Sequence, residues 1–279
     1  MNQPLPMTLE DHAGDVIRKS RAMKKIPLDA AAEAAGCSAP NLSRFEDDGL
    51  LNDELKWANL ATLLDLDPVK LERIAKGWLP APLNPETWPE FRQITTIGPA
   101  MSVHAYLVWD EVTCEAAIFD TGFDPQPIFD LIESEGLNPQ FLFITHMHGD
   151  HVAGLEKIRE RYPKIKLRTD STTAPLHCRN RRNDFIHLGG LRITNRDTPG
   201  HADDGVTYIV GNFPEDAPNI AIVGDAIFAG SMGGAANHGE LARQKVREQI
   251  LTLPDSTLIG PGHGPLTTVG QEKENNPFF

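Results

Sequence analysis

The sequence predicts a layered α/β domain preceded by a small all-α domain. From about residue 91 onward, short apolar runs of strand type alternate with amphipathic helical stretches, as in α/β layered domains. The first 80 residues show helical patterning instead. Between the two, GWLPAPLNPETWPE (77–90) is proline-rich and cannot continue a helix. We therefore expect a helical domain at 1–80, a linker at 81–90 and an α/β domain at 91–279.

The helical region has clear start and stop signals. LDAAAEAA (28–35) is a good helix that Gly36 should end, and Ser38 should cap a second helix with Pro40 in its first turn and Phe45 near its end. Two further helical stretches are expected at 59–66 and 69–76.

The second region supplies the strands and helices of the layered domain. Strand-like apolar runs occur at 103–109, 116–119, 141–144, 191–194, 206–210 and 220–223. Helical patterns occur between some of them, at 127–135, 152–161 and 240–251.

Composition and charge restrict the class of protein. Lys and Arg number 26 and Asp and Glu 39, so the formal charge is 26 − 39 = −13, and the overall field does not favour nucleic acid. No apolar run is long enough to span a bilayer, and the start lacks the basic-then-apolar pattern of a secretory signal. The three cysteines are far apart and form no CxxC pair. We expect a cytoplasmic protein without a membrane partner.

The strongest chemical signal is THMHGDH at residues 145–151, directly after the buried strand-like run FLFI. His146 and His148 are two positions apart, so they point to the same side of an extended segment and can hold one cation. Asp150 and His151 follow the turn at Gly149, where they can reach a second position. Four potential ligands within six residues favour a metal site over a packing role.

Three later segments each place a potential ligand beside a glycine after a strand-like run. TPGH contains His201, GD contains Asp225, and GPGHG contains His263. Glycine next to a ligand lets the backbone approach closely and direct the side chain inward. In combination with the first motif, these segments predict a site that holds two metal ions.

The combination THMHGDH, TPGH, GDAIFAG and PGHG resembles the metallo-β-lactamase superfamily, and within it the glyoxalase II-like hydrolases. The resemblance covers roughly residues 91–279 and implies an αββα sandwich with the metals at one edge. By motif position, it implies one metal bound by His146, His148 and His201, a second bound by Asp150, His151 and His263, and Asp225 bridging the two. Three protein ligands per metal plus a shared carboxylate leave open positions, as in catalytic sites.

Such a site has a defined chemistry. Two cations roughly 3.5–4 Å apart can hold a water between them and lower its pKa towards about 7, which yields a bridging hydroxide nucleophile. Asp150 is expected to be catalytic as well as a ligand, because it can accept a hydrogen bond from that hydroxide and orient it. We expect two divalent ions, Zn foremost with Fe or Mn as alternatives, and hydrolysis of a small thioester or ester.

Several features bear on the substrate. Glyoxalase II enzymes continue into a C-terminal helical region that grips glutathione, whereas sixteen residues follow His263 here. Asp203 and Asp204 after His201 would disfavour an anionic substrate, unless they only form a polar turn. Asp120 resembles the family's strand-end aspartate and either supports a ligand loop or caps a turn. His104 lies on a strand and is expected to be structural.

The helical region resembles the helix-turn-helix domain of Xre/Cro repressors. In that reading the helix from Ser38 to Phe45 enters the major groove, with Asn41, Ser43 and Arg44 nearest the bases. The basic stretch at 18–25 would meet phosphates, although residues 1–80 carry a net charge of 10 − 13 = −3. The alternative is a helical bundle that mediates dimerisation or covers the active site.

Three functions remain open at this stage. The leading one is the two-metal hydrolase, with a small-molecule substrate and a homo-oligomeric assembly. The second is a persulfide dioxygenase-like enzyme with a single iron bound by His146, His201 and Asp225. The third is a DNA-binding regulator whose metal domain senses a metabolite or a metal.

Overall fold

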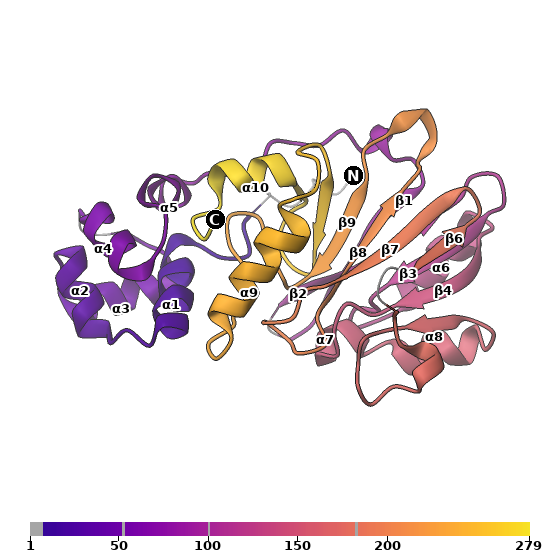
Figure 1. Ribbon diagram of the computed structural model, residues 1–279, viewed down its shortest axis with the longest axis horizontal. Helices are drawn as coiled ribbons and strands as arrows, with labels where there is room; N and C mark the ends of the chain where they lie inside the picture. Colours follow the sequence, from indigo (N-terminus) through magenta and orange to yellow (C-terminus); the bar gives the residue numbers. More distant parts are fainter. Residues whose placement is uncertain (1–7, 52–53, 100, 182–183) are drawn as a thin grey trace.

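The computed structural model describes residues 8–51, 54–99, 101–181 and 184–279. A helical domain lies beside a larger domain with two sheets, and the C-terminus lies between them (Figure 1). The expected layered α/β domain preceded by helices is confirmed. None of the helices in the described segments is long and apolar enough to cross a membrane.

The first sheet has the strand order β1-β2-β3-β4-β5. The first three strands pair antiparallel, while β3, β4 and β5 run parallel to one another. Its strands are β1 (Phe91–Ile97), β2 (Ser102–Trp109), β3 (Glu115–Phe119), β4 (Asn138–Phe143) and β5 (Lys166–Arg168).

The second sheet has the order β11-β10-β9-β8-β7-β6. All its neighbours are antiparallel except β9 and β10, which run parallel. Its strands are β6 (Phe185–Leu188), β7 (Leu191–Asp197), β8 (Val206–Gly211), β9 (Ile220–Gly224), β10 (Leu258–Pro261) and β11 (Thr267–Thr268).

The two sheets pack face to face and carry helices on their outer faces, which is the αββα arrangement. Phe119 and Phe143 of the first sheet share one buried cluster with Tyr208 and Ile222 of the second. On the outer face of the first sheet lie α6 (Gln126–Ser134) and α8 (Leu155–Arg161), after the single turn α7 (Gly149–Val152). The outer face of the second sheet is covered by α9 (Gly239–Lys245), the π-helical η4 (Val246–Ile250) and α10 (Val269–Asn275). Short 3-10 turns occur at η1 (Pro85–Thr87), η2 (Leu176–Cys178) and η3 (Pro214–Asp216).

Some elements differ from the expectation. The strands β1 and β6 were not predicted, because both are half exposed and have few fully buried positions. The helix expected at 152–161 begins only at Leu155, as α8, because Gly154 N donates to Thr121 Oγ1 at 2.9 Å and not to a carbonyl of the preceding turn α7. The helix expected at 240–251 changes from α to π geometry at Val246.

The helical domain contains five helices in its described part. They are α1 (Ala13–Lys24), α2 (Leu28–Ala35), α3 (Ala39–Asp48), α4 (Trp57–Leu64) and α5 (Pro68–Ala75). As predicted, Gly36 ends α2 in the left-handed conformation at φ 74°, and the Ser38 side chain caps α3 by accepting from Asn41 N at 3.3 Å. The helix α1 was not predicted; His12 and Asp15 form its capping box.

The helical domain and the sandwich share a hydrophobic core. Phe278 near the C-terminus and Met232 are almost fully buried in the same cluster as Ile17 of α1 and Leu71 of α5. Polar contacts accompany this packing: Arg243 donates to the carbonyls of Asp65 at 2.8 Å and Phe278 at 3.0 Å. The helices are therefore packed against the sandwich.

The loop after β9 is held by a buried carboxyl group on α10. Glu272 accepts from Gly230 N at 2.9 Å, Thr267 Oγ1 at 2.8 Å and Asn276 Nδ2 at 2.8 Å. Burial raises the pKa of Glu272 to about 7, even though these hydrogen bonds act in the opposite direction. The charged form is therefore costly in the folded protein.

We predict that Glu272→Gln stabilises the protein above pH 7. The pKa of Glu272 in the folded protein, about 7, lies above the ordinary value of 4.5. The stabilisation that protonated Glu272 gives the folded state is therefore fully present below about pH 4.5 and is lost as pH rises through 7. The amide oxygen can keep the two N–H donors, while its NH₂ donates to Thr267. At pH 8 the free energy of unfolding should rise by a few kcal/mol relative to wild type.

Chemical denaturation at pH 5 and pH 8 measures this difference. Glu274→Gln, an exposed position on the same helix, is the matched control and should show no such pH dependence. An equal effect of Glu272→Gln at both pH values would contradict the assignment.

Candidate metal centre

The predicted ligand residues come together at one edge of the sandwich. They lie in or at the start of the loops that follow the carboxyl ends of β4, β7, β9 and β10. Three overlapping groups lie close enough to hold an ion: His146, His148 and His201; His146, His151 and Asp225; and Asp150, His151 and His263. All seven side chains predicted from the motifs take part.

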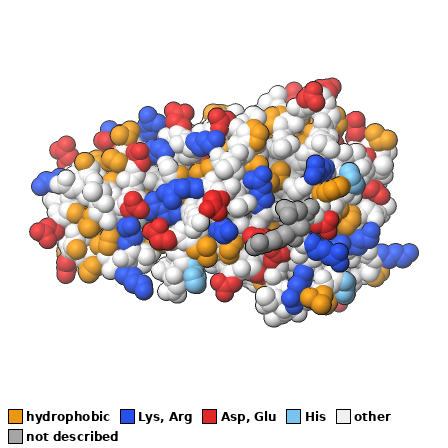
Figure 2. Space-filling view, viewed as in Figure 1, with side chains coloured by type: hydrophobic (Ala, Val, Ile, Leu, Met, Phe, Trp, Pro, Cys, Tyr) orange, Lys and Arg blue, Asp and Glu red, His pale blue; other side chains and the backbone are white. Residues whose placement is uncertain are grey.

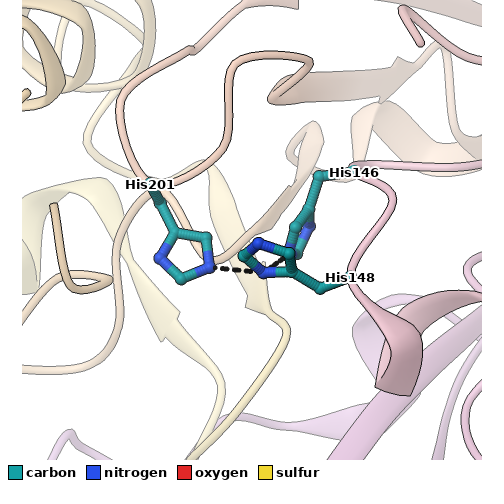
Figure 3. Close-up of side chains that lie close together, drawn as sticks. All are labelled: His146, His148 and His201. Carbon is teal, nitrogen blue, oxygen red and sulfur yellow. Dashed lines mark hydrogen bonds between the residues drawn. The ribbon is translucent and has the colours of Figure 1, made fainter.

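The first group consists of three imidazoles that face one another (Figure 3). Nδ1 of His148 lies 3.0 Å from Nε2 of His146 and 3.0 Å from Nε2 of His201. His146 is buried at 2% exposure, whereas His148 is exposed and His201 is half-buried. This side of the centre is therefore reachable from solvent.

The second group is more enclosed. Nε2 of His263 lies 3.2 Å from Oδ2 of Asp150, and Nε2 of His151 lies 3.6 Å from the same oxygen. His151 and His263 are both buried, while Asp150 is half-buried.

Asp225 lies between the two groups. Its Oδ2 is 3.4 Å from Nε2 of His201 and 3.4 Å from Nε2 of His263, and its Oδ1 is 3.3 Å from Nε2 of His151. A carboxylate in this position can contact an ion in either group, as the bridging role requires.

The outer nitrogens of the imidazoles are anchored, which turns the inner ones towards the centre. Nδ1 of His151 bonds Asp120 at 2.8 Å, Nδ1 of His201 bonds the Gly234 carbonyl at 3.0 Å, and Nδ1 of His263 bonds the Ser102 carbonyl at 2.6 Å. Such outer partners set the tautomer and ring orientation of metal-binding histidines.

The centre fits a cation. Nε2 of His151 and Oδ1 of Asp225 are buried without a hydrogen-bond partner, although buried polar atoms nearly always have one. A shared cation would satisfy both. Imidazole nitrogens with carboxylate oxygens are a donor set suited to zinc, iron or manganese.

The electrostatics of the site favour positive charge beside Asp225. Although burial acts in the opposite direction, the imidazoles of His151 and His263 beside Asp225 hold the pKa of this carboxyl group well below its usual range. In return, and again against burial, Asp225 raises the pKa of His263 to about 9. Burial, followed by the charge of His151, lowers the pKa of His146 to about 2, so this imidazole is neutral and able to ligate.

Glycines beside the ligands are required by the packing. A Cβ at Gly262 would lie 2.2 Å from Oδ1 of Asp225 and 2.6 Å from Cε1 of His151. A Cβ at Gly224, which has φ +52°, would lie 2.5 Å from Oγ1 of Thr145. The predicted close approach of backbone to ligands is present at both positions.

Asp120 supports the ligand loop, as one of its two interpretations predicted. It sits at φ 57° after β3 and accepts from Thr145 N at 2.7 Å and Thr145 Oγ1 at 2.7 Å, in addition to its contact with His151. The carboxylate therefore joins the start of the THMHGDH loop to one of its ligands.

Further groups hold the ligand loops in place. His104 is buried and holds the loop around His263, because its N donates to the Gly262 carbonyl at 2.8 Å and its Nε2 bonds the Gly264 carbonyl at 2.8 Å. Its predicted structural role is in agreement with these contacts. Every residue has a backbone carbonyl, so the sequence does not show that those of Ser102 and Gly234 anchor ligands.

The helical domain also contacts this centre. Nζ of Lys19 on α1 lies 5.0 Å from the centroid of the Phe228 ring, and that ring is 5.8 Å from the His263 ring. Lys19 also donates to the Met232 carbonyl at 3.0 Å. The loop that follows Asp225 is thus held against α1.

An αββα sandwich with a histidine and aspartate cluster at its edge defines a class of metal-dependent enzymes. A family model described as the metallo-beta-lactamase superfamily matches residues 98–263. The chain belongs to this superfamily, whose members bind divalent metals and include many hydrolases.

Individual relatives agree with this membership. The chain is 29% identical over 207 residues to the probable metallo-hydrolase YqgX of Bacillus subtilis, covering 66% of this chain and 94% of the relative. It is 28% identical over 205 residues to the hydroxyacylglutathione hydrolase GloC of Haemophilus influenzae, covering 64% and 94%. The crystal structure of ETHE1 from Myxococcus xanthus is similar with a TM-score of 0.58 and 26% identity, covering 67% and 83%.

We predict that Asp120→Asn weakens metal binding. The amide keeps the volume but removes the charge that polarises His151, so affinity for the ion nearest Asp150, His151 and His263 should fall about 10–100-fold. Competition with a chelator of known affinity measures this change.

Asp130→Asn, an exposed substitution on α6, should leave metal affinity as in wild type. Unchanged affinity at both ions in Asp120→Asn would show that this aspartate only stabilises a turn.

Proposed function

We propose that this protein hydrolyses a small thioester or ester with the help of two divalent metal ions. The observation that carries the proposal is the convergence of seven side chains, with the outer nitrogens of three imidazoles anchored and two buried atoms left without a hydrogen-bond partner. A packing role would require neither feature. Membership in a superfamily with many metallo-hydrolases supports the same reaction class.

The donor groups divide between the two ions as the motif order predicted. His146, His148 and His201 would hold one ion, Asp150, His151 and His263 the other, and Asp225 would contact both. Zinc is the foremost candidate, with iron or manganese as alternatives. When bound, such ions supply Lewis acidity, which polarises a substrate carbonyl and lowers the pKa of water to about 7.

Asp150 is the proposed catalytic side chain. Its Oδ2 faces His263 and His151, while its Oδ1 takes part in none of the hydrogen bonds or ion pairs among the described residues. That oxygen can accept a hydrogen bond from a water and orient its lone pair towards the carbonyl. No serine or cysteine nucleophile is then needed.

The thioester assignment is supported by the relatives and by the reaction chemistry. GloC is named a hydroxyacylglutathione hydrolase, which cleaves a thioester. A leaving thiolate is a soft anion that transition-metal ions stabilise well. Hydroxyacylglutathione is therefore a candidate substrate, to be tested beside simpler thioesters, esters and lactones.

A single-iron persulfide dioxygenase-like enzyme is the enzymatic alternative, supported by the similarity to ETHE1. It would use His146, His201 and Asp225 as a two-histidine, one-carboxylate set. That set leaves Asp150 and His263 without a metal role, although both face the centre. The geometry therefore favours two ions over one, and elemental analysis of the purified protein distinguishes them.

We predict that His148→Ala lowers hydrolysis by at least about 100-fold and removes one ion per chain, because a metal ligand is lost. The fold should persist, since His148 is exposed and packs in no core cluster. Metal content, thioester hydrolysis and circular dichroism measure the three parts.

The exposed histidine His187 on β6 offers the matched control, and His187→Ala should keep both metal and activity. Full activity of His148→Ala with wild-type metal content would contradict the ligand assignment.

DNA binding by the helical domain is the second candidate function. A three-residue turn, 36–38, joins α2 and α3, which is the loop length that helix-turn-helix motifs use. Arg44 on α3 is exposed, while Asn41 and Ser43 are half-buried. The basic stretch on α1 offers little to phosphates, however. Arg18 pairs with Asp15 and Asp47, Arg21 with Glu46, and Lys24 with Asp65.

The charges of the visible surface agree with this. On the face drawn in Figure 2, acidic and basic side chains are interspersed over the helical domain at the left. We therefore favour the alternative in which the helices cover the active site.

A variant separates the two roles. We predict that Arg44→Ala leaves hydrolysis at the wild-type rate, because Arg44 is exposed on a helix that contacts no metal-binding residue. Gel shifts with random and genomic DNA at physiological salt test the other function; binding that is lost in this variant would establish α3 as a recognition helix.

We also propose a cytoplasmic homo-oligomer. The three cysteines, all in described segments, form no disulfide, as expected in a reducing compartment. Analytical ultracentrifugation measures the assembly.

A further inference from the structure

The segment that precedes α1 lies against the metal centre. Gly264 directly follows the ligand His263 and has φ +74°. A Cβ on this glycine would lie 3.0 Å from the backbone nitrogen of Glu10 and 3.1 Å from its Cβ. Glu10 is therefore packed on the His263 loop, although the two positions are more than 250 residues apart in sequence.

This segment is held in place by its neighbour. Asp11 is buried, accepts from Ser231 Oγ at 2.6 Å and pairs with Lys19. Ser231 belongs to the loop that follows Asp225, and Lys19 in turn donates to the Met232 carbonyl at 3.0 Å. Both anchors lie on the loop that follows Asp225, and together with the packing on Gly264 they fix the backbone at Glu10.

Glu10 contributes a negative charge to the surroundings of the site. Its side chain is exposed, and its carboxylate interacts electrostatically with His263 and Asp225. By contrast, Asp11 is already paired with Lys19, so it offers no free charge to a ligand. Glu10 is the acidic group of this segment that a substrate can meet.

Lys19 is the basic side chain that acts on Glu10, and it is paired with Asp11. No lysine or arginine occurs within three positions of any of the seven metal-binding side chains. On the His201 loop, Asp203 is exposed and Asp204 is half-buried, which adds to the acidic character predicted there. Beside Glu10, a carboxylate of the substrate would meet repulsion, whereas an ammonium group would be attracted.

We propose that Glu10, supplied by the helical domain, determines the charge class of the substrate: the site prefers thioesters or esters that carry an ammonium group and discriminates against those with carboxylates. The inference rests on the proposed hydrolase function and specifies its substrate class. It places glutathione thioesters, which bear two carboxylates, among the poorer substrates. Glu10 acts through recognition and takes no part in bond cleavage.

Three acetyl thioesters that differ in charge test the proposal. Acetylthiocholine is cationic, S-acetyl-N-acetylcysteamine is neutral, and S-acetyl-3-mercaptopropionate is anionic; each releases a thiol that a disulfide reagent detects. The full-length, metal-loaded protein is compared with Glu10→Gln and Glu10→Lys. Glu33→Gln, which removes an exposed carboxylate from α2 of the same domain, is the matched control.

We predict that wild type prefers the cationic over the anionic thioester in kcat/KM. Glu10→Gln should reduce this ratio about fivefold, the size expected for one exposed ion pair, and Glu10→Lys should reduce it further. The change should reside in KM rather than kcat, and the preference should shrink as ionic strength rises. The neutral thioester and the metal content per chain should be the same in all variants, and Glu33→Gln should match wild type.

The outcomes separate the two proposals. An equal cation-to-anion ratio in wild type, Glu10→Gln and Glu10→Lys would overturn the role of Glu10 while leaving the hydrolase function in place. Hydrolysis of none of the three thioesters by the metal-loaded wild type would overturn both.

Discussion

The buried carboxylate of Asp225 is the constraint on which the centre depends. Removing a carboxylate from water costs several kcal/mol unless positive charge or donors replace the solvent. Here the imidazoles of His151, His201 and His263 surround it, each within 3.4 Å. They can do so only because Asp120 and two backbone carbonyls anchor their outer nitrogens. These anchors follow strands of both sheets or lie at their ends, so the sandwich itself maintains the charge balance of the site.

The architecture was predictable where one residue pattern dominates a segment. From Ala116 to Phe119 the strand β3 is buried on both faces, as is the last half of β4, which ends at Phe143, and the apolar runs there identified both strands. By contrast, β1 alternates between buried and exposed positions and follows a proline-rich stretch, so its sequence contains no apolar run that would predict a strand. The start of α8 after Gly154 coincides with a hydrogen bond from Gly154 N to Thr121 Oγ1, a tertiary contact that no local pattern contains. The hydrophobic pattern thus identifies strands that are fully buried, whereas the ends of other elements depend on tertiary packing.

The inner part of the centre was more predictable than its surroundings. The ligands of such a metal site are His and Asp side chains, so His146 and its partners can be identified from residue type and spacing. The outer partners need only an acceptor atom, and a backbone carbonyl such as that of Ser102 serves as well as a side chain. His104 performs its role through the Gly264 carbonyl and looks in sequence like any strand histidine. A role that only one or two residue types can fill can be predicted from the sequence, whereas a role that any acceptor atom can fill cannot.

The helical domain shows how a familiar pattern can serve another purpose. The helix end at Gly36 and the helix start at Ser38 agree with the sequence signals, yet such signals concern only the bundle and not what it contacts. Charged groups that would face phosphates in a DNA-binding protein are paired within this chain, as Arg21 is with Glu46 and Lys19 with Asp11. Because Lys19 also packs over Phe228 beside His263, the ion pairs of α1 connect the bundle to the loops that carry Asp225 and His263. A bundle attached in this way stabilises the geometry of the metal centre, so the two domains form one structural unit around it.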